Sequence, residues 1–207
     1  MSLYREPPES VTVHGKEYPV DTDFRRWIEF QGMLVAKEDD TTKAERLCGF
    51  MKSLGLPPSQ ESLEAMMEFY SAASQEKPGA GKARPQAFDF EQDSEFVFSA
   101  FWECYGIDLS KVKLHWWRFK ALFKSLPQDC EICRIMGYRT ADMKDVPKHQ
   151  KQLYREMKAR YALNGGNPAY RTEQDMKDYV KRRYEEAQIR MSLLRGGGQS
   201  GDAGSKS

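Results

Sequence analysis

The chain has 207 residues and a mass of 23.9 kDa, which is enough for one domain with its own hydrophobic core. Charged residues make up 30% and aromatic residues 12%, a composition that excludes a disordered chain, and no run of 18 uncharged apolar residues is available to span a membrane. The N-terminus has no apolar signal segment, so we expect a cytoplasmic protein whose four cysteines are reduced.

The net charge of +1 is divided unevenly along the chain. Residues 1–110 carry a net charge of −9, whereas residues 111–190 carry +9. Such a division is found in nucleic-acid-binding proteins, and it also arises where two parts of a molecule, or two copies of it, attract each other. We prefer the second interpretation, because charge runs are more often solvated or complementary faces.

Residues 11–20 predict a small β-hairpin with Gly15-Lys16 as its two-residue turn. The expected cross-strand pairs are Val13 with Tyr18 and Val11 with Val20. A hairpin of this size is marginal in water, so we expect it to pack against helices.

Three helices are predicted next, because each has a capping signal and an apolar stripe. The first covers about 23–36 and is capped from Asp21-Thr22-Asp23. The second opens at the capping box that begins with Thr42, and the third at Ser59. The stripe of the third helix includes Met66 and Met67.

Residues 74–87 contain two glycines, two prolines and no large apolar residue, which is typical of a flexible linker. A further helix is expected at 89–105, capped by Asp89 and ended by Gly106. The next is expected at 111–126, followed by a short helix at 128–136 that Gly137 ends. The last two are expected at about 145–163 and at 172–191. The buried side of the helix at 89–105 is expected to carry an apolar set: Phe90, Val97, Ala100, Phe101 and Cys104.

The predicted fold is mainly α, with a small N-terminal β-hairpin and a disordered tail at 196–207. Residues 1–73 form an acidic helical part, 74–87 the linker, and 88–195 an aromatic-rich basic part. We expect the acidic and basic parts to form one compact domain.

The chain has one CxxC motif, Cys130 to Cys133. It suggests zinc binding with His115 or His149, or a redox pair. A second ligand pair at short spacing and a βαβ context are both missing, so we predict a structural role and no metal or cofactor. Phosphate-loop, dinucleotide and nucleophile-elbow motifs are also missing, so we do not expect an enzyme.

The adjacent Trp116 and Trp117 are the strongest candidates for a partner surface, because tryptophan and arginine dominate protein contacts. Trp117 shares a helical face with Leu114 and Ala121, so we predict that Trp117 is buried and that Trp116 faces a partner. Basic and aromatic side chains also alternate along 118–139 in a way that nucleic-acid sites show, although no nucleic-acid-binding motif accompanies them.

Several ordered motifs resemble one family. They are VTVHGKEYPVDTDFRRWIEF at 11–30, the run at 89–143 with Y-G-I-D-L, L-H-W-W-x-F-K-A-L and I-M-G-Y-R, and LYREMKARYAL at 153–163. This set is similar to the bacteriophage gene-product-fifteen family of Gram-positive phages with long non-contractile tails. The resemblance fades beyond about residue 165.

The resemblance implies a tail assembly chaperone in the host bacterial cytoplasm, which keeps the tape-measure protein soluble until tail-tube subunits displace it. The expected partners are the tape-measure protein, other tail assembly proteins and further copies of the chain. A structural tail or connector component that stays in the virion is the alternative, and a nucleic-acid-binding regulator is a third possibility. The predicted partner-binding residues are Trp116, Arg118, Lys120, Tyr138, Arg139, Met66 and Met67.

Overall fold

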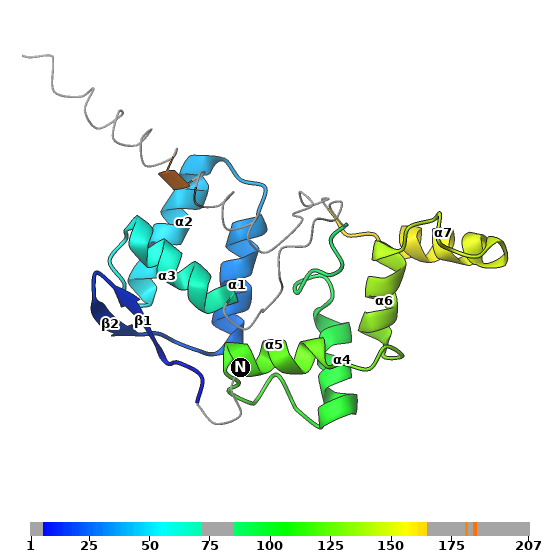
Figure 1. Ribbon diagram of the computed structural model, residues 1–207, viewed down its shortest axis with the longest axis horizontal. Helices are drawn as coiled ribbons and strands as arrows, with labels where there is room; N and C mark the ends of the chain where they lie inside the picture. Colours follow the sequence, from blue (N-terminus) through cyan, green and yellow to red (C-terminus); the bar gives the residue numbers. More distant parts are fainter. Residues whose placement is uncertain (1–5, 72–84, 165–180, 182–183, 186–207) are drawn as a thin grey trace, which may run out of the picture.

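The computed structural model describes residues 6–71 and 85–164, together with Lys181, Tyr184 and Glu185. Within this part of the chain, a two-stranded antiparallel hairpin is followed by seven α-helices and one short 3-10 helix (Figure 1). The mainly α fold with an N-terminal hairpin is therefore confirmed. Most of the predicted helix at 172–191, most of the linker at 74–87 and the tail at 196–207 lie outside the described residues.

The hairpin and α1–α3 form one side of the molecule, and α4, α6 and α7 form the other (Figure 1). Helix α5 runs between the two sides and contacts α1. The elements are β1 (Ser10–Val13), β2 (Lys16–Pro19), α1 (Phe24–Val35), α2 (Asp40–Ser53), α3 (Gln60–Ser71), α4 (Ser94–Tyr105), α5 (Trp116–Lys124), α6 (Glu131–Thr140), the 3-10 helix η1 (Lys148–Gln150) and α7 (Lys151–Arg160).

The hairpin turn differs from the prediction by one residue. His14 and Gly15 form the turn, with φ of 51° and 72°, so that Val13 pairs with Lys16 and Val11 with Tyr18. Positive φ at both central residues is the geometry of a type I′ turn, whose twist matches that of the flanking strands. The predicted turn was wrong because it required Gly15 at the first turn position and left His14 in the strand.

Several predicted helix ends are confirmed by their caps. Asp23 accepts a hydrogen bond from the backbone N–H of Arg25 (3.0 Å), and the hydroxyl of Ser59 accepts one from Ser62 (3.1 Å). Gly106 follows α4 with a φ of 65°, as a left-handed residue at a helix end requires.

Other predicted ends were wrong. Helix α2 begins at Asp40, because Asp39 accepts from the backbone N–H groups of two residues in the first turn and takes the place of the predicted Thr42 capping box. The carboxylate of Asp89 caps only a turn, and α4 begins five residues later. Three helices are shifted or shortened relative to the sequence prediction: α5 at 116–124, α6 at 131–140 with Gly137 inside it, and α7 at 151–160.

The core joins the two sides of the molecule through aromatic rings. Phe119 of α5 stacks on Phe24 of α1 at 4.6 Å between ring centroids, and on Phe101 of α4 at 5.1 Å. Phe101 and Phe119 have no exposed surface. Offset stacking of fully buried rings adds to the hydrophobic free energy of burial. Helix α5 is therefore the central element through which the helices on the two sides of the molecule contact each other.

His115 caps the N-terminus of α5. Its Nδ1 accepts a hydrogen bond from the backbone N–H of Trp117 (3.0 Å), and its Nε2–H donates to the Pro8 carbonyl (3.0 Å). Both bonds require the neutral ring with the proton on Nε2. Burial lowers the pKa of His115 below its ordinary value of 6.5, and the nearby Arg118 acts in the same direction.

We expect this cap to make stability depend on pH. Because the folded-state pKa is lowered, the contribution of neutral His115 is present above pH 6.5 and is lost as the pH falls through the lowered value. The variant His115→Asn keeps a capping side chain that does not titrate. Urea unfolding between about pH 7.5 and 5 should show a smaller loss of stability in this variant than in the wild type. Equal losses would contradict the assignment.

Candidate interaction surface

Of the two adjacent tryptophans, Trp116 is the fully buried one, whereas the sequence predicted Trp117. Trp116 is 1% exposed, its indole N–H donates to the Tyr70 carbonyl (2.9 Å), and its ring stacks on the Tyr70 ring. Trp117 is half-buried and donates to the Phe69 carbonyl (2.8 Å). The prediction was wrong because Trp116 shares the buried face of α5 with Phe119, three residues further on.

Lys120 and Arg118 also make contacts within the chain. The Lys120 ammonium donates to the Tyr70 carbonyl (3.0 Å) and lies over the rings of Tyr70 and Trp116, at 5.2 and 5.5 Å from their centroids. Arg118 is exposed and forms an ion pair with Glu6 in the segment before the hairpin. Of these two cations, Arg118 is the more accessible to a partner.

Met66 and Met67 do not form a surface. Met66 is 0% and Met67 4% exposed, and both belong to the hydrophobic core. In this structure the two methionines are therefore not accessible as an adaptable apolar surface, because α3 packs against β1 and both side chains lie in the core cluster.

Tyr138 lies in an open groove of about 720 Å³ between α6 and the segment that leads to α7. Its ring packs edge-on against Tyr154, at 5.2 Å between centroids. Arg134 and Asp142 also line the groove. Tyr138 is thus one of the predicted partner-binding residues that line an open groove in the described structure.

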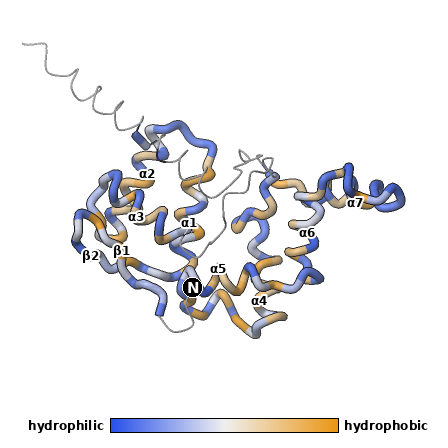
Figure 2. Tube along the Cα trace, in the orientation of Figure 1, coloured by the Kyte–Doolittle hydropathy of each residue, from blue (hydrophilic) through white to orange (hydrophobic). Residues whose placement is uncertain are grey.

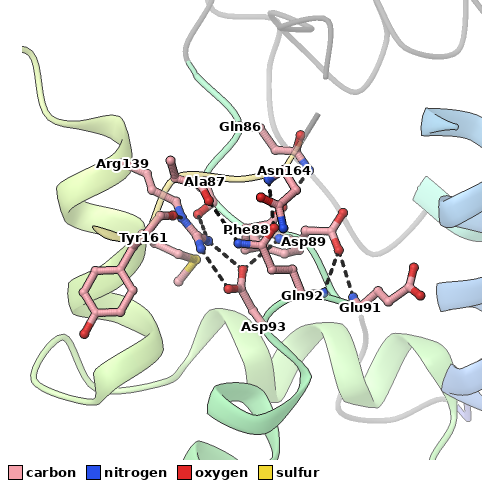
Figure 3. A network of polar contacts seen from close by, with 12 residues as sticks. Gln86, Ala87, Phe88, Asp89, Glu91, Gln92, Asp93, Arg139, Tyr161 and Asn164 are labelled. Atoms are coloured by element: carbon pink, nitrogen blue, oxygen red, sulfur yellow. Dashed lines mark hydrogen bonds and ion pairs between the residues drawn. The ribbon is translucent and has the colours of Figure 1, made fainter. Parts of the chain in front are cut away.

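Arg139 is buried, with 5% of its side chain exposed, and it is a structural residue (Figure 3). Its guanidinium forms two hydrogen bonds with the carboxylate of Asp93, at 2.6 and 2.9 Å. Two further N–H groups donate to the carbonyls of Tyr161 (2.6 Å) and Ala87 (3.1 Å). In this structure Arg139 therefore has a role inside the fold, because its bidentate pair with Asp93 and its two bonds to carbonyls occupy most of its donors.

The polar network around Arg139 ties three segments together (Figure 3). Gln92 donates to the Ala162 carbonyl (3.1 Å) and accepts from the backbone N–H of Asn164 (2.9 Å). The segment after α7 is thus held against the start of α4, beside the Asp93–Arg139 pair.

The CxxC cysteines are packed in the structure. Cys130 is buried in the core, and burial together with the neighbouring Cys130 thiol raises the pKa of Cys133 to about 12. A raised pKa keeps the thiol protonated at neutral pH, the opposite of what a nucleophilic cysteine needs. Within residues 6–71 and 85–164, no three His, Cys, Asp or Glu side chains are grouped closely enough to hold a metal ion.

The largest exposed aromatic side chains lie on α4. Trp102 is 53% and Phe98 38% exposed, and their rings stack with centroids 6.4 Å apart and planes 13° from parallel. Figure 2 colours much of α4 as hydrophobic. Large apolar side chains grouped on a surface mark an interaction site more often than scattered ones do.

Two exposed carboxylates lie on the same helix as this pair. Glu95 and Glu103 are exposed on α4, and residues 85–110 contain six acidic residues and no lysine or arginine. In the part of the chain that the structure describes, neither glutamate forms an ion pair. We call Phe98, Trp102, Glu95 and Glu103 the α4 face.

The α4 face was not predicted from the sequence. The predicted buried stripe of this helix included Val97 and Phe101, which are buried, and Cys104, which is exposed. Phe98 and Trp102 are four residues apart and outside that stripe, and this spacing was the signal that could have identified them.

The helices that the structure describes include none that is long and apolar enough to cross a membrane. A family model described as "Bacteriophage Gp15 protein" matches residues 5–163. No curated protein and no solved structure matches the chain.

Proposed function

Because the chain belongs to the bacteriophage Gp15 family, we propose that it acts in phage tail assembly as a chaperone of the tape-measure protein. In this proposal it is a binding protein of the host cytoplasm and not an enzyme. It holds apolar helical segments of its client until the tail tube assembles around them. Family membership supports a structural or assembly role in a phage, and the chaperone role is our proposal within it.

The observation that carries the proposal is the exposed pair Phe98 and Trp102. A chaperone of helical segments needs an apolar surface on which one face of an amphipathic helix can lie. The α4 face offers two stacked rings on a rigid helix, whose opposite side is fixed in the core by Val97 and Phe101. Aromatic side chains on a rigid element bury a large area at a low cost in side-chain entropy.

The carboxylates of the α4 face select among apolar clients. A client helix with lysine or arginine beside its apolar stripe would place those cations against Glu95 and Glu103, whereas an acidic helix would be repelled. One short helix offers too small an area for tight binding, so many copies would act along one client, and each could be displaced.

Co-expression with the tape-measure protein tests the proposal. The wild-type chain should keep the client soluble, and Trp102→Ala should weaken capture by about 2 kcal/mol, as loss of a contact hot spot does. Because Trp102 is half exposed, the variant should fold normally. Val112 is 37% exposed and lies outside the α4 face, so the control Val112→Ala, which shortens this side chain, should behave as the wild type.

Equal client solubility with and without the chain would contradict the chaperone role. Mass spectrometry of purified virions separates the proposal from the alternative. A chaperone should be absent from the finished particle, whereas a minor tail or connector component should be present in a fixed copy number.

A further inference from the structure

A short helical part of the C-terminal region packs against α2 and α3, on the side of the molecule opposite to α4 (Figure 1). Lys181, Tyr184 and Glu185 are helical, and their spacing of three and four residues places them on one helical face. Tyr184 is 4% exposed and belongs to the hydrophobic core. The face therefore has one buried aromatic side chain between a cation and a carboxylate.

Helices α2 and α3 receive this face through groups that lie around the tyrosine. The Tyr184 hydroxyl is 3.6 Å from the Cys48 thiol on α2. The Lys181 ammonium forms an ion pair with Glu64 on α3 (2.6 Å). The bonds from Lys181 and Gln60 hold the pKa of Glu64 below its ordinary value, so the carboxylate is ionised and attracts a cation at neutral pH.

The side-chain amide of Gln60 joins the two parts. It donates to Glu64 (3.1 Å) on its own helix and to Glu185 (2.7 Å) on the packed segment. The groups of α2 and α3 that contact the segment thus recognise a cation, an aromatic hydroxyl and a carboxylate at fixed spacing. We call these groups the α2–α3 site, and its residues are Cys48, Gln60 and Glu64.

The contact resembles the docking of a separate helix. The Lys181 and Glu64 side chains are 48% and 43% exposed, and exposed ion pairs add little to stability. A thiol is also a weak hydrogen-bonding partner for the Tyr184 hydroxyl. The family model covers residues 5–163, so the α2–α3 site lies within the matched region and the segment that occupies it lies beyond it.

We propose that the α2–α3 site is a second client-binding site, which Lys181, Tyr184 and Glu185 occupy as an internal competitor. The occupant that they imitate is an amphipathic helix of the client, in which an aromatic residue follows a lysine or arginine by three positions. Helix-in-groove recognition uses anchors at this spacing. The identity of the client rests on the proposed function.

The charge of α3 favours a basic client helix. Glu61, Glu64 and Glu68 follow one another at spacings of three and four residues, so their side chains share a face of α3. Cations beside the aromatic anchor of a client would lie along this row, whereas carboxylates there would be repelled.

Competition inside the chain predicts a gain of binding when the anchor is removed. An occupied site binds a second helix with an affinity reduced by the fraction of molecules in which the site is empty. Loss of Lys181 and Tyr184 should therefore strengthen the binding of a helix at the α2–α3 site. A contact that only stabilises the fold would give no such gain.

Fluorescence anisotropy with a labelled peptide of residues 172–191 tests the site on the full-length chain. The variant Lys181→Ala/Tyr184→Ala should bind the peptide about tenfold more tightly than the wild type, or better. The control Lys151→Ala/Tyr154→Ala removes the same two residue types at the same spacing from α7, and it should bind as the wild type. Because Lys181 is half exposed, Lys181→Ala alone should fold normally and show a smaller gain.

Charge reversal locates the bound peptide. Adding Glu64→Lys to the emptied variant Lys181→Ala/Tyr184→Ala should remove the gain, and a peptide that carries Lys181→Glu should restore it. The inference is overturned if the emptied variant and Lys181→Ala bind the peptide no more tightly than the wild type, or if Glu64→Lys leaves the gain unchanged.

Co-expression with the tape-measure protein extends the test to the client. At equal amounts of chain, the emptied variant should keep more of the client soluble than the wild type does. If the wild type solubilises the client and the emptied variant does no better, the inference fails and the proposed function stands. If neither solubilises the client, both fail.

Discussion

Replacing Trp116 with alanine is expected to destabilise the protein by about 3–5 kcal/mol, as truncation of a large core side chain does. Trp116 is 1% exposed and packs between Tyr70 and Phe119, with ring centroids 5.3 and 5.8 Å away. The small residue would leave a cavity at the junction between α3 and α5, where the two sides of the molecule meet.

Two further variants show which part of the Trp116 side chain matters. Trp116→Phe keeps an aromatic ring but loses the hydrogen bond to the Tyr70 carbonyl. The Lys120 ammonium also donates to that carbonyl, so the acceptor keeps a partner and the loss should be about 1–2 kcal/mol. Trp117→Ala, at a half-buried position, should cost less than Trp116→Ala. Urea unfolding measures all three, and a larger loss for Trp117→Ala would contradict the assignment of the buried tryptophan.

Breaking the Arg139–Asp93 pair is the second large effect. Both side chains are at least 95% buried, so removing one partner leaves an uncompensated charge in the interior. Arg139→Met and Asp93→Ala should each destabilise by about 3–5 kcal/mol. Arg118→Met breaks an exposed pair with Glu6, and this control should change stability by less than about 1 kcal/mol.

The double variant Arg139→Met/Asp93→Ala separates the pair from its surroundings. Because the second substitution removes the charge that the first leaves unpaired, the combined loss should be smaller than the sum of the single losses. Additive losses in urea unfolding would show that the two side chains contribute independently, contrary to the structure.

Local signals in the sequence were sufficient for the fold class and for several helix ends. Asp23, Ser59 and Gly106 were predicted correctly because each acts through hydrogen bonds or backbone conformation within its own turn. Asp39 was missed because two capping signals, Asp39 and the capping box at Thr42, lie close together at the start of α2. A capping-box sequence inside the first turns of a helix looks the same as one at its N-terminus. Gly137 was taken for a helix end, although a glycine is tolerated inside a helix that packs against its neighbours.

The interaction surface could not be predicted as well, because exposure depends on tertiary packing. Helix α4 contains five aromatic residues in 12 positions, so periodicity alone does not say which of them lack a neighbour. Arg139 looked like a surface cation because its partner, Asp93, is 46 residues away in the sequence. Trp116 and Trp117 are adjacent on a short helix. Which of them is buried depends on how the C-terminal end of α3 packs against them.

Photo-cross-linking in infected cells tests most directly whether the α4 face binds the tape-measure protein. Ser99 is exposed on α4 between Phe98 and Trp102, so a photo-reactive amino acid there leaves both rings in place. A cross-link from Ser99 to the tape-measure protein is expected during tail assembly, and none from the same group placed at Val112. A folded, expressed protein that forms no cross-link to the tape-measure protein from Ser99 would contradict binding at the α4 face.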